Sequence, residues 1–139
     1  MARVLRWLVL AMGVACVAIG VFHLALGNSA VPGEGSADAT VDSLNRFFGA
    51  IFAGYGLAWI WAARQSPIPA TAVRWLAGVF LLGGIGRLLS LAAHGWPQWF
   101  QVVLTSIELV MPPLYFWLAD ADERAGRVST RRVVGDPVL

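Results

Sequence analysis

The sequence contains no lysine, because all 10 of its basic residues are arginine, and it has little charge of either sign. Charged residues make up 13% of the 139 positions, whereas about 25% is usual in a soluble domain. Hydrophobic residues make up 58% of the chain, and the mean hydropathy is +0.70. This composition argues against a soluble globular domain and favours a single membrane domain.

The chain also lacks the residue patterns of common catalytic and metal sites. Cys16 is the single cysteine, so no intrachain disulfide or cysteine-based metal site is expected. No His-x-x-x-His, Cys-x-x-Cys or serine–histidine–acid pattern is present, and the glycine-rich segment 83–87 lacks the features of a phosphate-binding loop. We therefore predict no cofactor and no metal, and an intramembrane enzyme is the least favoured class. Scattered arginines also give no support for nucleic-acid binding.

Four apolar runs are each about as long as the ~20 residues that cross a bilayer core. They predict helices over residues 7–26, 44–63, 75–93 and 99–118. We expect an all-α membrane protein, a four-helix transmembrane bundle in one domain of residues 1–118. The remainder, 119–139, contains arginine and few apolar residues, which predicts a mobile cytoplasmic tail.

The arginines also predict the orientation of the bundle. Those outside the apolar runs lie before the first run, between the second and third, and after the fourth: Arg3, Arg6, Arg64, Arg74, Arg124, Arg127, Arg131 and Arg132. Because cytoplasmic loops are enriched in arginine, both termini are expected in the cytoplasm. The tryptophans lie near the ends of the runs, as expected for an interfacial belt. The predicted location is the cell membrane, with multiple passes.

Two charges lie within the third and fourth runs. Arg87 lies roughly 9 Å from the end of the third run, and Glu108 roughly 14 Å from the start of the fourth. The short link 94–98 predicts antiparallel neighbours, and helical side chains lean toward their own N-terminus, so the two should converge. Pairing lowers the cost of burying charge in a bilayer. The pair either locks the two helices together or lines a polar pocket, and the sequence leaves both readings open.

Other polar residues fall on stripes of small residues in the same outer half of the bundle. His23 is a candidate for ligand binding or proton relay, although a histidine on a packing seam also fits. Arg46 either extends to lipid headgroups or holds an anionic group, with Asp42 one turn before it. The predicted ligand-binding or buried polar cluster is His23, Asn45, Arg46, Arg87, Ser90 and Glu108.

The same residues carry a resemblance to a known family. The segments are Asn45-Arg46-Phe47-Phe48-Gly49 with Gly54 and Gly56, Gly86-Arg87-Leu88-Leu89-Ser90, Gly95-Trp96-Pro97, and Glu108. Over about residues 5–118 the chain resembles the small four-span bacterial membrane proteins catalogued as a domain of unknown function. The resemblance implies a four-helix fold in the bacterial inner membrane and supports Arg87, Ser90 and Glu108 as a unit. It implies no activity.

Two functional hypotheses follow. The first is a non-enzymatic membrane accessory protein that binds a lipid or small amphiphile, or scaffolds a membrane assembly, through the Arg/Glu/His cluster. The second is a small oligomeric proton-coupled transporter using Glu108 and His23, with Pro112 and Pro113 bending the fourth helix. The expected partners are membrane lipid and a membrane-protein partner or a second copy of the chain.

Overall fold

The computed structural model describes residues 2–32 and 38–134. This part of the chain consists of four long helices with one short 3-10 turn and has no strand, which confirms the predicted all-α fold. The elements are α1 (Ala2–Leu26), η1 (Gly27–Ala30), α2 (Ala39–Arg64), α3 (Ala70–His94) and α4 (Trp99–Val134).

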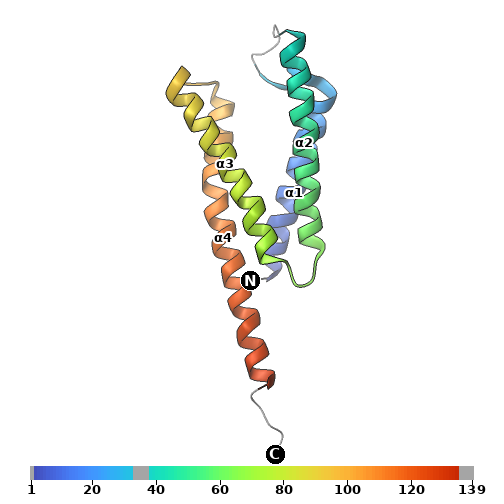
Figure 1. The fold of residues 1–139 in the computed structure, drawn as a ribbon, viewed down its shortest axis with the longest axis vertical. Coiled ribbons are helices and arrows are strands. Elements are labelled where there is room, and N and C mark those ends of the chain that lie inside the picture. Colours follow the sequence, from blue (N-terminus) through green and yellow to red (C-terminus); the bar gives the residue numbers. More distant parts are fainter. Residues whose placement is uncertain (1, 33–37, 135–139) are drawn as a thin grey trace, which may run out of the picture.

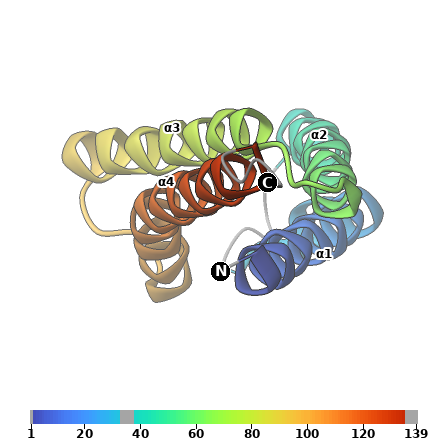
Figure 2. The ribbon, with the colours of Figure 1, turned by 90° about the horizontal axis from the view of Figure 1, so that it is seen from below.

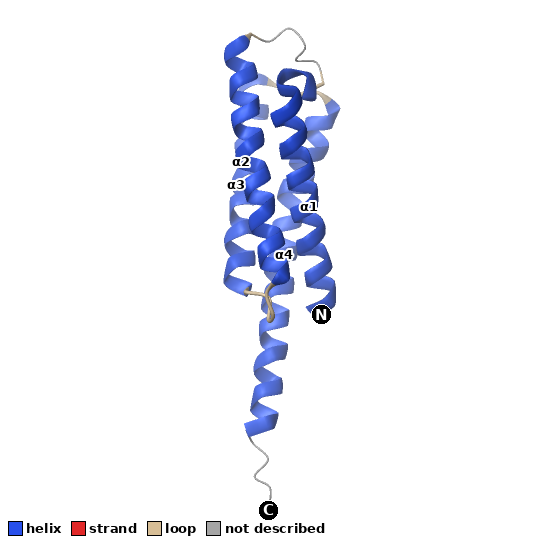
Figure 3. Cartoon of the chain, turned by 90° about the vertical axis from the view of Figure 1, so that its right-hand side faces the viewer, coloured by secondary structure: helices blue, strands red, loops and turns tan. Residues whose placement is uncertain are grey.

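The helices form two hairpins that diverge from one end of the molecule (Figure 1). Helices α1 and α2 run side by side in one hairpin, and α3 and α4 form the other. The hairpins meet near the N-terminus and the α2–α3 link, and they separate toward the η1 turn and the α3–α4 link, as Figure 1 and Figure 3 show. By the arginine rule, the end where they meet is the predicted cytoplasmic end.

Glycines set the close approach of α1 and α2. A Cβ added at Gly20 would lie 2.4 Å from the backbone nitrogen of Ala53, and one added at Gly56 would lie 2.6 Å from that of Val17. Gly13 and Gly49 are equally crowded by the partner helix. Small residues allow helix backbones to touch in a membrane, where packing replaces the hydrophobic effect between helices. The α1–α2 hairpin is therefore a tightly packed unit.

A compact core and two hydrogen bonds join the hairpins at the closed end. Trp59 of α2 and Tyr115 of α4 are both almost completely buried, with ring centroids 4.8 Å apart. The Tyr115 hydroxyl donates to the Leu8 carbonyl of α1 at 2.9 Å, and the Tyr55 hydroxyl donates to the Leu76 carbonyl of α3 at 2.5 Å. Each bond crosses from one hairpin to the other, so the closed end is fixed while the opposite end is open.

Helix α4 differs from the sequence-based expectation at its C-terminal end. The apolar run ends at residue 118, where the tail was expected to begin, but α4 continues as a helix through Val134. Arg74 of α3 contacts Asp120 at 2.5 Å and Glu123 at 2.7 Å, and Arg127 pairs with Glu123 one turn later at 2.9 Å. Such ion pairs support a solvated helix without an apolar face. The expectation of a mobile tail over 135–139 lies outside the described residues.

The surface of the hairpins is apolar. Large hydrophobic side chains are exposed on all four helices, for example Trp7 at 69%, Phe48 at 60%, Leu89 at 67% and Val110 at 67%. Three helices are long and apolar enough to cross a membrane: the segments Ala2–Ala30, Ala70–His94 and Trp99–Val128. A soluble protein rarely exposes so much contiguous apolar surface. These features are those expected of a membrane protein.

Figure 2, viewed from below, shows that α4 is bent, so that its first turns run in a different direction from the rest. Pro112 and Pro113 lie inside α4 and remove two backbone donors from it. Prolines are the usual cause of such a bend. Pro112 lies one turn after Glu108 on this helix.

Candidate functional site

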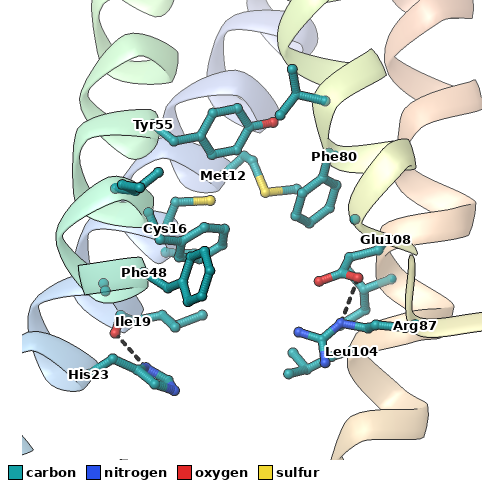
Figure 4. A pocket seen from close by; sticks show the side chains of 18 of the residues that line it. Met12, Cys16, Ile19, His23, Phe48, Tyr55, Phe80, Arg87, Leu104 and Glu108 are labelled. Atoms are coloured by element: carbon teal, nitrogen blue, oxygen red, sulfur yellow. Dashed lines mark hydrogen bonds and ion pairs between the residues drawn. The ribbon is translucent and has the colours of Figure 1, made fainter. Parts of the chain in front are cut away.

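A cavity of about 870 Å³ lies between the two hairpins and is lined by all four helices (Figure 4). Most of its wall is aliphatic, aromatic or methionine side chain. The polar side chains on the wall are Cys16, His23, Asn45, Tyr55, Arg87, Gln101, Glu108 and Tyr115. The cavity therefore combines a large apolar surface with a few polar groups, which is the usual composition of a small-molecule site.

Arg87 and Glu108 form the predicted ion pair across the α3–α4 hairpin. The Arg87 Nε donates to Glu108 Oε2 at 2.8 Å, and a second guanidinium nitrogen donates to the side-chain oxygen of Gln101. The Glu108 side chain is 10% exposed and the Arg87 side chain 36% exposed. The pair forms because α3 and α4 are antiparallel and both side chains lean toward the same level.

Glycine makes room for Glu108 on the facing helix. A Cβ added at Gly84 of α3 would lie 3.1 Å from the Glu108 Cβ, and one added at Gly83 would lie 3.8 Å from Glu108 Oε2. Figure 4 shows that one carboxylate oxygen faces Arg87 while the other points into the cavity. One oxygen of Glu108 is therefore bonded to Arg87, and the other faces the cavity.

His23 lies on the opposite wall, on α1, as Figure 4 shows. Its Nδ1 lies 2.9 Å from the Ile19 carbonyl oxygen one turn earlier. A carbonyl oxygen only accepts, so Nδ1 carries the proton in this contact, and Nε2 of the neutral ring is an acceptor. His23 and Glu108 thus contribute acceptors to one cavity from different hairpins.

Asn45 also lines the cavity, but Arg46 does not. The Asn45 amide donates to the side-chain oxygen of Asn28 at 2.8 Å. Arg46 Nη1 instead donates to the carbonyls of Leu24 and Ala25, both at 2.9 Å. These carbonyls are in the last turn of α1, where no intrahelical donor is available. Arg46 therefore caps α1, which neither of the sequence-based readings of this residue anticipated.

Asp42 completes the contact between α2 and the end of α1. Its carboxylate accepts from Arg46 Nε at 2.7 Å and from the Asn28 backbone at 3.0 Å. The bond from the Arg46 guanidinium, followed by that from Asn28, holds the pKa of Asp42 below its usual range. Gly27 has a φ of +55°, and a Cβ there would overlap the Asp42 carboxylate, so the turn requires glycine.

Ser90 is exposed one turn after Arg87 and does not line the cavity. The structure thus brings His23, Asn45, Arg87 and Glu108 to the cavity and places Arg46 and Ser90 elsewhere. The predicted polar cluster did not include Gln101, although this residue lies two turns before Glu108 on the same face of α4 and its position could have indicated it. It also missed Tyr55, for which the sequence offers no comparable signal.

No group of three histidine, cysteine or acidic side chains that could hold a metal ion occurs in the part of the chain that the structure describes. The polar groups on the cavity wall can donate and accept hydrogen bonds and present one paired charge.

Comparison with known protein families gives one match. A family model described as a domain of unknown function (DUF4345) matches residues 4–119, which is most of the chain. The chain belongs to this family, and the resemblance inferred from its motifs is confirmed. No curated protein and no solved structure matches the chain.

Proposed function

We propose that this member of the DUF4345 family is a non-enzymatic integral membrane protein that binds a lipid or small amphiphile between its two hairpins. The observation that carries the proposal is the cavity itself, with its mainly apolar wall and the Arg87–Glu108 pair on one side. An amphiphile has the same division between a long apolar part and a small polar part. A cavity of about 870 Å³ is also within the range of small-molecule sites.

The proposal includes four transmembrane helices with both termini in the cytoplasm. Helix α2 is the one that falls short of the hydropathy of the other three. Its tryptophans, tyrosine and glycines lower its hydropathy, but it packs along α1 through Gly49 and Gly56 and exposes Phe47, Ile51 and Leu57. A helix packed along a spanning neighbour with an apolar outer face is expected to span as well. The arginine distribution supports the cytoplasmic location of both termini.

Filling the cavity tests the proposal directly. Ala15 lines the cavity, whereas Ala18, one turn later on the same helix, is exposed but does not line it. We expect Ala15→Trp to displace a bound amphiphile and Ala18→Trp to leave it in place. The measurement is native mass spectrometry of each protein released from membranes in mild detergent, which reports any bound species by its mass.

A species of defined mass on the wild type and on Ala18→Trp, but not on Ala15→Trp, is the expected result. Protein without a bound species in all three samples would contradict the proposal. The alternative in that case is a scaffold for a membrane assembly, in which the exposed apolar faces contact another protein or a second copy. Crosslinking in intact membranes then identifies the neighbouring chain.

A second candidate function is proton-coupled transport. The observation that favours it is that Glu108 and His23 line one cavity from opposite walls, and both side chains can carry a proton. Transport predicts substrate flux in proteoliposomes that depends on a pH gradient and is lost in Glu108→Gln. Flux that ignores pH, or that survives this substitution, removes the transporter hypothesis.

A further inference from the structure

The cavity wall carries no net charge at its polar cluster. Arg87 and Glu108 neutralise each other at 2.8 Å, and Gln101, the third member of the cluster, is uncharged. A ligand therefore meets an ion pair that is already formed. An anionic head would face the Glu108 oxygen that points into the cavity, and a cationic head would face the guanidinium. Like-charge repulsion of this kind therefore disfavours a ligand with a full charge of either sign.

Several polar groups on the wall are already used within the protein. The hydroxyls of Tyr55 and Tyr115 donate to backbone carbonyls of the opposite hairpin. Asn45 donates to the side-chain oxygen of Asn28. These bonds hold the structure together, so the two tyrosine hydroxyl protons and one of the two Asn45 amide protons are not available to a ligand.

The groups that remain can both donate and accept. Glu108 Oε1 faces the cavity, and His23 Nε2 is an acceptor on the other wall. The remaining guanidinium nitrogen of Arg87, Nη2, and the side-chain amide nitrogen of Gln101 are donors, and among the residues described neither has a hydrogen-bond acceptor. A hydroxyl group both donates and accepts, so a head with more than one hydroxyl matches this arrangement. A head that only accepts, such as a carboxylate, leaves the acceptors Glu108 and His23 without donors.

We infer that the ligand of the cavity is an uncharged amphiphile whose head carries hydroxyl groups, with the chemistry of a monoacylglycerol. This inference rests on the proposed function and specifies its ligand class. The apolar chain lies against the aromatic and aliphatic wall, and the hydroxyls lie between the Arg87–Glu108 pair and His23.

Three probes, each with a sixteen-carbon chain that includes the carbonyl carbon where one is present, test the contribution of the head group. They are monopalmitoylglycerol, palmitate and hexadecyltrimethylammonium, each titrated into the wild-type protein in detergent micelles and followed by native mass spectrometry. We expect monopalmitoylglycerol to bind about tenfold more tightly than either charged probe, because a buried polar group left without a partner weakens binding by that factor or more.

The Glu108→Gln variant makes a sharper prediction. With the acid replaced by an amide, the Arg87 guanidinium is left without its counter-charge on the cavity wall. We expect the preference to reverse, so that palmitate binds more tightly than monopalmitoylglycerol. A purely structural role of the pair predicts no such reversal. Ser90→Ala is the matched control, because Ser90 lies one turn from Arg87 but outside the cavity, and its selectivity should equal that of the wild type.

His23→Phe gives a second variant in case Glu108→Gln does not fold. His23 bonds only within its own helix, so its replacement should disturb packing little. We expect weaker binding of monopalmitoylglycerol by several-fold and unchanged binding of palmitate, because only the hydroxylated head donates to this side chain.

The outcomes separate this inference from the proposed function. Equal binding of all three probes, or tightest binding of palmitate by the wild type, overturns the inference and leaves amphiphile binding in place. Binding of none of the probes, together with protein that carries no amphiphile from the membrane, overturns both.

Discussion

Removal of Arg87 should destabilise the protein more than removal of Arg87 and the Glu108 charge together. In the wild type, Glu108 is the buried charged residue of the described chain, and Arg87 Nε is 2.8 Å from its carboxylate. Arg87→Ala leaves this carboxylate in an apolar wall without its donor. Arg87→Ala combined with Glu108→Gln removes both charges, so no unpaired ion remains.

The expected magnitudes follow from burial. Removal of one partner of a buried ion pair costs about 3–5 kcal/mol of stability, and solvent screening reduces this cost where a partner is exposed. Because the Arg87 side chain is 36% exposed, we expect Arg87→Ala to lower the free energy of unfolding by about 2–4 kcal/mol. Glu108→Gln keeps an oxygen that accepts from Arg87, so about 1–2 kcal/mol is expected for it and for the double variant.

The assay is a double-mutant cycle of unfolding free energies in mixed micelles of a mild detergent and dodecyl sulfate, followed by circular dichroism. Because the double variant is expected to lose no more stability than Glu108→Gln alone, the coupling energy between the two sites should equal the Arg87→Ala loss, about 2–4 kcal/mol. Arg3→Ala is the control, because Arg3 is exposed at the start of α1 and should change stability little. Additive losses, with the double variant less stable than either single variant, would refute the argument that the pair matters for folding.

Three further predictions concern packing, pH and topology. Gly20→Ala should lower the free energy of unfolding by about 1–3 kcal/mol, because its Cβ would lie 2.4 Å from the backbone of α2. Gly54→Ala is the control and should be neutral in the same unfolding assay, because no atom lies within 4 Å of a Cβ added there. The pKa of Asp42 is lower in the folded state than in the unfolded state, so its contribution to stability is complete above the unfolded pKa of about 3.9 and is lost as the pH falls through the folded pKa. The difference in melting temperature between the wild type and Asp42→Asn should therefore persist at pH 7 and shrink at acidic pH near the folded pKa. In a cysteine-free background, Ser29→Cys should react with an impermeant thiol reagent from outside intact cells and Ser66→Cys only after permeabilisation, and the opposite pattern would reverse the proposed orientation.

The fold was largely predictable because hydrophobic length carries most of the information in a membrane helix. The runs 7–26 and 75–93 lie within α1 and α3, and the link 94–98 was enough to place Arg87 beside Glu108. The helical continuation of α4 was not predictable by this reasoning, because ion pairs rather than apolar residues support it.

The site was predicted in part, for a reason that lies in the physics of long side chains. Glu108 and His23 are short enough that their position on the helix decides where they point. Arg46 is longer, and the exposed carbonyls at the end of α1 compete for it with headgroups and ligands. A spacing rule gives the face of a helix, but it does not give the partner that a flexible arginine selects. The bonds of Tyr55 and Tyr115 to backbone carbonyls require the three-dimensional arrangement of the hairpins and have no sequence signature.

The sequence left two interpretations of the Arg87–Glu108 pair open, a lock between two helices or part of a polar pocket, and each predicts a different geometry. A lock between α3 and α4 requires only that the two side chains meet, and it would work best with both fully enclosed between those helices. Instead, the Arg87 side chain is 36% exposed, and the second Glu108 oxygen points toward the other hairpin. Placing a polar group on the wall of an apolar cavity gives no advantage to a lock, since water or lipid competes there for the same bonds. These features support the proposed binding role of the pair. The decisive comparison is between stability and selectivity in the same Glu108→Gln protein: a lock changes only the first, whereas a binding site also reverses the second.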